Sequence, residues 1–271
     1  MFKLVIGNKN YSSWSMRPWL ALRANGIPFE EVFIPLYTGQ ADKARILGFS
    51  RAGKVPTLVD GDATVWDSLS IIEYLAEKFP QTKLWPDDRS ARAHARSISA
   101  EMHSGFMALR NECGMNLHRP VGAVAMSDDA LANAARIEAI WAECHQRYGK
   151  GGPFLFGAFS GADAMFAPVI HRFRTYAIPV ADNAMAPTGR CRFMPHSLRS
   201  AMKPECISAE IERAWARRAR SSGHNRASGN RSATYSMMAS ESQIVTSPSI
   251  SAGTLPECVK LKIRFLSASP V

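Results

Sequence analysis

The sequence predicts a small α/β domain followed by an all-α domain and a basic tail. Residues 1–80 alternate between β-branched apolar runs and helical stripes, in the order βαβ and then ββα, which favours a mixed sheet. Longer helical patterns run from residue 87 to about residue 180. Residues 181–271 contain fifteen serines and no sustained period, so we expect a disordered tail there.

Local signals place the elements of the first domain. Asp60-Gly61 between two β-forming runs favours a tight hairpin turn, and Gly26 ends the first helical stripe. The predicted elements, in chain order, are a strand over Lys3–Ile6, a helix over Arg17–Asn25, a strand over Pro28–Pro35, a hairpin over Val55–Val59 and Ala63–Trp66, and a helix over Ser68–Phe79.

The second domain is predicted from longer patterns. Ser90–Asn116 is alanine-rich and indicates one long helix, while Asp128–Tyr148 carries apolar residues at helical spacing behind two acids that suit a helix start. Ser160 and Asp163 lie three residues apart, directly before an apolar run. This spacing resembles a capping box with Asp in place of the usual Glu. We expect every element of this domain to be helical.

Charge and cysteine content narrow the class of protein. The net charge is +10, but residues 1–180 hold 20 Lys/Arg and 17 Asp/Glu, so most of the excess belongs to the tail. Without interleaved aromatic residues, that tail is weakly indicative of nucleic-acid binding, which we do not expect. The five cysteines form no CxxC pair, which argues against a zinc site or a dithiol centre and favours a reducing cytoplasm. No apolar run approaches a membrane span of about 20 residues.

Several stretches resemble the glutathione S-transferase family, in that family's order and spacing. "SSWSMRPWLAL" after the first strand is similar to the zeta-class motif and to stretches of tau-class and bacterial serine-type transferases. "KVPTLVDGD" resembles the family's Val-Pro hairpin entry with its cis-proline, and "DSLSIIEYL" resembles the start of its third helix. "SGADAMFAPV" resembles a helix of the family's C-terminal domain, so the resemblance covers roughly residues 3–180.

This resemblance implies a thioredoxin-like N-terminal domain, a helical C-terminal domain, a homodimer, and glutathione as co-substrate for a small electrophile, without a metal. Two features depart from the pattern. Trp14 stands where the zeta class has cysteine, and the tail lacks the family's last helix. Because another reading frame over Pro195–Ser200 would give a family-like segment, a frameshifted gene is one hypothesis for residues 181–271.

The resemblance makes Ser12 the candidate that activates the glutathione thiol. A free thiol titrates at about 8.5, and a hydroxyl donor at a helix N-terminus would stabilise the thiolate. Ser13 and Tyr11 remain alternatives for this role. Ser13 and Ser15 are also candidates to cap the helix.

The other expected contacts to glutathione follow from the same resemblance. Val55, before the cis-proline Pro56, would pair through its backbone with the cysteinyl part. Asp67 would bind the ammonium group and Ser68 the carboxylate of the γ-glutamyl part. The remaining candidates are Lys54 and Gln40 for the glycyl carboxylate, with Ser13 and Trp14 lining the pocket.

Four further side chains have expected roles outside the contacts to glutathione. Arg17 is expected to tie the domains together through a carboxylate, and Trp19 to pack the first helix against the second domain. His103 and Arg110 lie on the same predicted helix. This helix should face the cleft, where the two side chains would suit an anionic substrate. We make no site assignment for these two.

The predicted function is that of a glutathione transferase-like enzyme, with conjugation, isomerase and peroxidase chemistry all open. The alternatives are a non-catalytic glutathione-binding or partner-binding protein on the same fold, and a nucleic-acid-binding protein that uses the basic tail. The sequence does not identify the electrophile, because dispersed apolar residues form that pocket.

Overall fold

The computed structural model describes residues 1–36, 39–149 and 152–180, so the tail predicted over 181–271 lies outside the described residues. The first domain contains, in chain order, β1 (Phe2–Ile6), α1 (Ser13–Ala24), β2 (Phe29–Phe33), α2 (Gln40–Leu47), β3 (Thr57–Asp60), β4 (Ala63–Trp66) and α3 (Ser68–Lys78). A 3₁₀ turn, Pro80–Thr82, lies in the segment between the two predicted domains.

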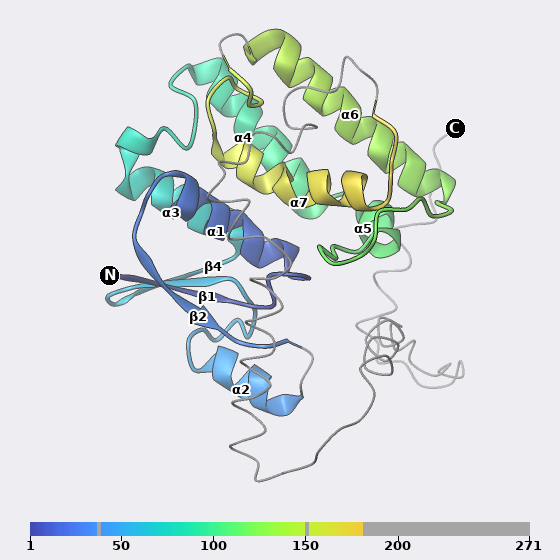
Figure 1. Ribbon diagram of the computed structural model, residues 1–271. Coiled ribbons are helices and arrows are strands. Elements are labelled where there is room, and N and C mark those ends of the chain that lie inside the picture. The colour runs from blue at the N-terminus through green and yellow to red at the C-terminus, as the bar shows by residue number, and fades with distance from the viewer. Residues whose placement is uncertain (37–38, 150–151, 181–271) are drawn as a thin grey trace, which may run out of the picture. The chain divides into compact units, whose positions relative to one another are not determined.

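The four strands form one mixed sheet in the order β2-β1-β3-β4. The crossover through α1 makes β1 and β2 parallel, while the tight turn after Asp60 makes β3 and β4 antiparallel. Figure 1 shows α1 and α3 on one face of the sheet and α2 on the other. The predicted mixed sheet is confirmed, and β1 lies inside it.

Because both faces are covered, β1 is apolar on both sides. Leu4 and Ile6 join the large core beneath α1 and α3. Val5 joins a smaller cluster with Ile34 and Ile46 beneath α2. The alternation of side chains along one strand thus attaches two separate helical layers to it.

Helix α2 was not predicted. It starts after Gly39, which has φ 114° and makes no side-chain cap. Among its described side chains, the two that are buried are Asp42 and Ile46, so its apolar stripe is too short to be recognised in the sequence. Tertiary contact with the sheet, rather than local pattern, defines this helix.

The second domain comprises α4 (Arg89–Ser104), α5 (Met107–Glu112), α6 (Asp128–Tyr148) and α7 (Gly161–Thr175). The prediction for Asp128–Tyr148 is confirmed, but the single helix over Ser90–Asn116 is wrong. The helix is interrupted at Gly105 and Phe106, and Phe106 adopts φ 63°. This left-handed residue is 8% exposed, so burial of its ring in the core stabilises a turn that local propensity disfavours.

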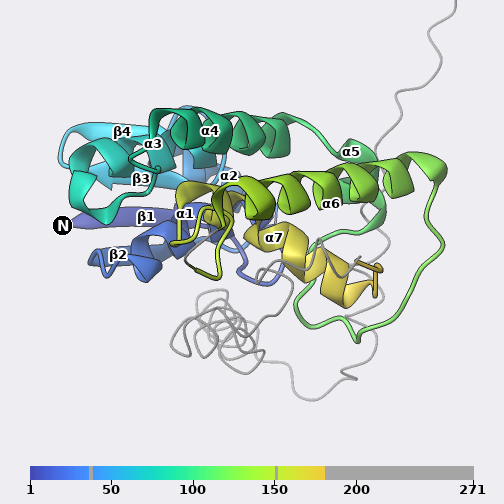
Figure 2. The ribbon, with the colours of Figure 1, turned by 90° about the horizontal axis from the view of Figure 1, so that it is seen from above.

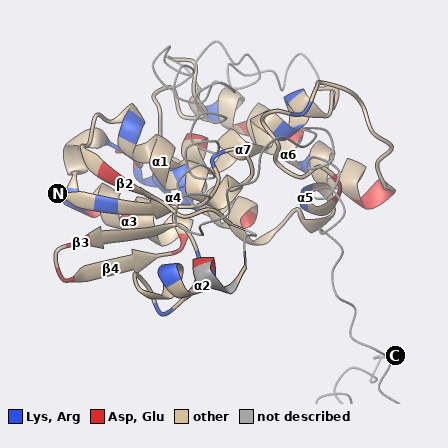
Figure 3. Cartoon of the chain, turned by 60° about the horizontal axis from the view of Figure 1, so that its bottom comes forward, with Lys and Arg blue, Asp and Glu red and all other residues tan. Residues whose placement is uncertain are grey.

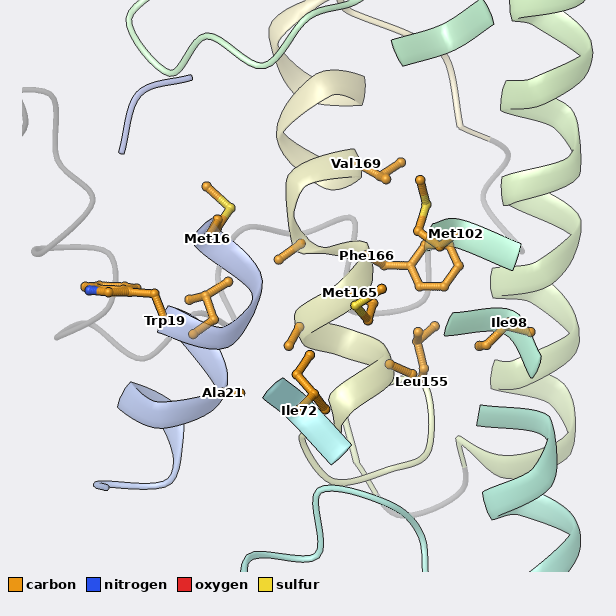
Figure 4. Close-up of a cluster of buried hydrophobic side chains, with 14 of the residues drawn as sticks. Met16, Trp19, Ala21, Ile72, Ile98, Met102, Leu155, Met165, Phe166 and Val169 are labelled. Carbon is orange, nitrogen blue, oxygen red and sulfur yellow. The ribbon is translucent and has the colours of Figure 1, made fainter. Parts of the chain in front are cut away.

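Helix α7 is buried along most of its length. It packs against α1 and α4, and Figure 2 shows it running beside α6, whose Trp141 contacts Phe166 and Phe173 of α7. Figure 4 shows Met165, Phe166 and Val169 projecting from this helix into the core. A helix that is apolar on nearly all sides is expected at the centre of a domain.

The predicted capping box at the start of α7 is confirmed. The Asp163 carboxylate accepts hydrogen bonds from the Ser160 backbone N–H (2.9 Å) and hydroxyl (2.7 Å). The same carboxylate accepts the Leu155 N–H at 3.0 Å. Burial raises the pKa of Asp163 to about 6, although these hydrogen bonds oppose the shift.

The described residues carry both signs of charge over the two domains, as Figure 3 shows, with blue and red segments interspersed. None of the helices within the described ranges is long and apolar enough to cross a bilayer.

Candidate active site

A cleft of about 1000 Å³ opens where the β1–α1 turn, α2, the segment before β3 and the β4–α3 junction meet, and α4 adds His103 to its wall. It is lined by eight of the nine predicted site residues: Ser12, Ser13, Trp14, Lys54, Val55, Pro56, Asp67 and Ser68. The ninth, Gln40, is the first residue of α2, and its side chain is not among the described ones. Segments far apart in sequence therefore converge on one cleft.

Ser12 is the N-cap of α1. Its Oγ accepts the Ser15 N–H at 3.3 Å and donates to Ser15 Oγ at 2.8 Å. The helix thus begins at Ser13, four residues earlier than predicted, and the cap belongs to Ser12 rather than to Ser13 or Ser15. No acidic residue occupies the first turn, so the positive end of the helix dipole faces the cleft uncompensated.

The turn that carries Ser12 is held by backbone contacts. The Asn8 carbonyl accepts the N–H groups of Tyr11 (3.0 Å) and Ser12 (2.8 Å). The Gly7 N–H donates to Ser15 Oγ at 3.1 Å. A Cβ at Gly7 would lie 2.4 Å from Leu36 Cδ1, so glycine permits this close approach.

Asn10 fastens the same turn to the helical domain, a contact that the sequence did not indicate. Its Oδ1 accepts the N–H groups of Leu117 (2.6 Å) and His118 (3.1 Å), and its Nδ2 donates to Asn116 Oδ1 at 3.1 Å. Asn10 is 1% exposed. The position of Tyr11 and Ser12 thus depends on a loop more than 100 residues away in sequence.

Arg17 was predicted to tie the two domains together through a carboxylate. Among the described residues it forms no ion pair with one. It is 1% exposed, and its Nη1 donates to Ser68 Oγ at 3.3 Å, which links α1 to the start of α3 within the first domain. Burial, reinforced by the charges of Arg110 and Arg172, lowers the pKa of Arg17 to about 9, and Asp67 opposes this shift. The guanidinium is a buried positive charge behind the cleft.

Trp14 lies between two guanidinium groups. Arg17 Cζ is 4.5 Å from its ring centroid and Arg110 Cζ is 4.6 Å from it. Because Arg110 belongs to α5, Trp14 connects the first domain to the helical domain. Trp14 also lines the cleft, and its contact with glutathione stays a prediction.

The prediction that Trp19 packs the first helix against the second domain is wrong. Its Nε1 donates to Glu31 Oε2 at 2.7 Å, on β2 of its own domain. Figure 4 shows its ring on the side of α1 away from α7. The domain contact of α1 is made instead by other faces of the helix, because a 12-residue helix presents different side chains to the sheet edge and to α7.

The segment before β3 contains the predicted cis bond, between Val55 and Pro56. The Thr57 hydroxyl donates to the Lys54 carbonyl at 3.2 Å, which fixes the backbone on both sides of that bond. Lys54 is exposed at the rim of the cleft. Lys43 of α2 also lines the cleft, and it was missed because α2 itself was not predicted.

The β4–α3 junction presents Asp67 and Ser68. Asp67 has φ 78° and caps α3 by accepting the Leu69 N–H at 2.8 Å. Ser68 is 1% exposed and receives the Arg17 hydrogen bond. His103 of α4 completes this wall, with its Nε2 3.2 Å from Asp67 Oδ2. Met102 and Phe106, which lie before and after it in the sequence, are core residues.

A βαβ unit followed by a ββα unit with a cis-proline, joined to an all-helical domain, defines a thioredoxin-like protein with an appended helical domain. Residues 11–78 match the sequence-family model described as Glutathione S-transferase, N-terminal domain. Residues 125–192 match the one described as Glutathione S-transferase, C-terminal domain, so the two matches cover about half of the chain. The chain belongs to the glutathione S-transferase family.

Individual relatives agree with this assignment. Glutathione S-transferase 1 of Dianthus caryophyllus is 32% identical over 148 residues, 54% of this chain and 62% of that protein. A probable maleylacetoacetate isomerase of Caenorhabditis elegans is 39% identical over 100 residues, 37% of this chain and 46% of that protein. The chain thus spans less than two thirds of these two relatives.

Solved structures share the fold. A glutathione transferase homolog from Burkholderia, crystallised with bound glutathione, is similar with a TM-score of 0.53 and 24% identity. The similarity covers 73% of this chain and 95% of that one. At this identity, the likeness supports the architecture and carries no residue assignments.

Proposed function

We propose that this protein is a glutathione transferase in which the Ser12 hydroxyl stabilises the glutathione thiolate. The observation that carries the proposal is the position of Ser12: an N-cap hydroxyl on the cleft wall, at a helix start with no acidic residue in its first turn. Family membership supports glutathione as the co-substrate, since the cleft has the chemistry for a small anionic peptide.

The other cleft residues receive roles that fit their positions. The Val55 backbone beside Pro56 pairs with the cysteinyl part, and Ser68 with the γ-glutamyl carboxylate. Asp67 binds the γ-glutamyl ammonium group. Lys54 lies at the rim for the glycyl carboxylate, a role for which Gln40 remains a second candidate.

The chemistry requires one rotation of a hydroxyl. Ser12 Oγ–H donates to Ser15 in the structure, and it would turn to donate to the glutathione sulfur while Oγ still accepts the Ser15 N–H. The thiol proton leaves to solvent. The thiolate then forms an S–C bond to an electrophilic carbon, and that carbon's leaving group departs with the bonding pair. With an activated double bond as substrate, the thiolate would instead add to one carbon of that bond. After rotation about the resulting single bond, the thiolate would be expelled and the double bond would form again. The net reaction is isomerisation, and no glutathione is consumed.

The same proposal includes a homodimer, which the family resemblance implies, and a cytoplasmic location, which the cysteine content favours. The buried free thiols Cys113 and Cys144 are compatible with a reducing compartment. Size-exclusion chromatography with light scattering on the full chain tests the dimer, and a monomer at micromolar concentration would contradict it.

Substitutions at Ser12 test the mechanism. We expect Ser12→Ala to lower kcat/KM on a panel of conjugation, isomerase and peroxidase substrates by about 10²-fold, because the thiolate loses its hydrogen-bond donor. The pKa of the bound thiol, measured by its ultraviolet absorbance, should rise.

The matched control is Ser12→Asp, because aspartate preserves the helix cap but cannot donate and carries a negative charge. It should melt near the wild-type temperature and still be inactive. Unchanged turnover in Ser12→Ala would remove Ser12 from this role. Glutathione binding by the wild type without turnover of any substrate would favour the non-catalytic alternative, for which the Ser12–Ser15 hydrogen bond is the supporting observation.

A further inference from the structure

Asp67 and His103 meet across the boundary between the two domains. Asp67 precedes α3, His103 lies in the last turn of α4, and Asp67 Oδ2 is 3.2 Å from His103 Nε2. Both residues line the cleft of about 1000 Å³ and also a hollow of about 640 Å³ along α3. The pair is therefore part of the wall between the two spaces.

The carboxylate of Asp67 is held from two sides. Its Oδ1 accepts the Leu69 N–H at 2.8 Å as the cap of α3, and its Oδ2 faces His103. The backbone of Asp67, at φ 78°, lies in a region that non-glycine residues rarely adopt. A carboxylate oxygen can accept more than one hydrogen bond. A ligand ammonium group can therefore bind Asp67 without displacing Leu69 or His103.

Two positive side chains and one negative one act on the pKa of His103. Burial lowers its pKa from the ordinary value, with Arg17 of α1 and Arg110 of α5 acting in the same direction and Asp67 opposing them. Glu73 and Glu77 of α3 line the hollow on its other side.

The ring of His103 is fixed in orientation. It packs edge-on against Trp14, with ring centroids 5.1 Å apart. Its Nδ1 is buried with no hydrogen-bond partner among the described residues. In a neutral imidazole with its proton on Nε2, that N–H lies next to Asp67 Oδ2, because the two heavy atoms are 3.2 Å apart.

We propose that His103 is a positioning residue of the proposed glutathione site: it fixes the Asp67 carboxylate for the ligand's ammonium group, and protonation of His103 weakens that contact. This inference rests on the proposed function. Neutral His103 holds Asp67 through the contact at Nε2 and leaves the carboxylate its full charge. Protonated His103 neutralises Asp67 and repels the ammonium group, so ligand binding expels a proton and affinity rises with pH through the histidine's titration.

Calorimetric titration of the full chain with S-methylglutathione, whose sulfur does not titrate, tests the inference between about pH 4.5 and pH 7.5. This range extends well below the ordinary histidine pKa of about 6.5, because burial lowers the pKa of His103. We expect wild-type affinity to fall about fivefold at the acid end, the factor for a part-exposed charge pair. An analogue without the α-amino group should show no such fall.

Two variants separate positioning from packing. His103→Gln supplies an amide donor at nearly the place of Nε2 and should keep wild-type affinity at pH 7.5 while losing the pH dependence. His103→Ala should lose affinity at pH 7.5 by about fivefold, because the Asp67 carboxylate loses its polar contact with Nε2. A flat wild-type profile, or an unchanged profile in His103→Gln, would overturn the inference. Failure of the wild type to bind S-methylglutathione at any pH would instead overturn the proposed function.

Discussion

Helices α1 and α7 pack against each other, yet their first turns are stabilised by different chemistry. The start of α7 is closed by the Asp163 carboxylate, which is 5% exposed and accepts three hydrogen bonds. The start of α1 has the neutral cap Ser12 and no acidic residue in its first turn. The protein thus supplies its own anion to the helix dipole in the core, and leaves the dipole uncompensated at the cleft.

Among substitutions at the two helix starts, the largest loss of stability is expected at the start of α7. Asp163→Ala leaves the N–H groups of Leu155 and Ser160 and one hydroxyl buried without their acceptor. We expect the free energy of unfolding to fall by about 3–5 kcal/mol, the range for breaking a buried hydrogen-bond network. Urea denaturation followed by circular dichroism measures it. A loss below about 1 kcal/mol would mean that the capping box contributes little.

The pH dependence of the same carboxylate gives a second, smaller effect. Its folded pKa of about 6 lies above the ordinary aspartate value of 3.8, so the protonated form is the one favoured by folding. Its stabilising contribution is full below pH 3.8 and is lost as pH rises through about 6. We expect a change of about 3 kcal/mol, since one pKa unit corresponds to about 1.4 kcal/mol.

The reference variant for this measurement is Asp163→Asn, which does not titrate. The difference in unfolding free energy between wild type and Asp163→Asn should shift against the wild type between about pH 4 and pH 7. A difference that is constant over this range would contradict the raised pKa. Using the difference removes the contribution of the other titrating groups.

The smallest effect is expected at α1. Ser12→Ala should lower the free energy of unfolding by about 1 kcal/mol, because the Ser15 N–H loses its cap, while Ser12→Gly should cost only a few tenths. Thermal melting of the two variants beside the wild type tests the order. A loss in Ser12→Ala as large as that in Asp163→Ala would show that the α1 start is as essential to folding as the buried α7 start.

Features with a local cause were predictable from the sequence. The hairpin around Gly61, helix α6 and the capping box of α7 all depend on residues within a few positions of each other. The residues of the candidate site were found through motifs, and eight of the nine line one cleft. These motifs lie at turns and helix ends, where the required residue types are few.

Features decided by contacts between distant segments were missed or wrong. Helix α2 depends on the sheet beneath it, and the break between α4 and α5 depends on burial of Phe106. Trp19 and Arg17 have partners that helical spacing does not reveal, because two faces of α1 are buried against different neighbours. Asn10 and His103 gain their roles from the opposite domain.

The sequence by itself determined the two-domain class, the positions of most helices and strands, and the hydroxyl and carboxylate types offered to the cleft, because these follow from local propensity, periodicity and capping. Tertiary structure decided which serine caps α1, that Trp14 lies between Arg17 and Arg110, and that His103 faces Asp67. The contacts of Trp14 with Arg110 and of His103 with Asp67 are set by side-chain packing across the domain boundary, where each contact depends on the positions of two segments that are far apart in the sequence.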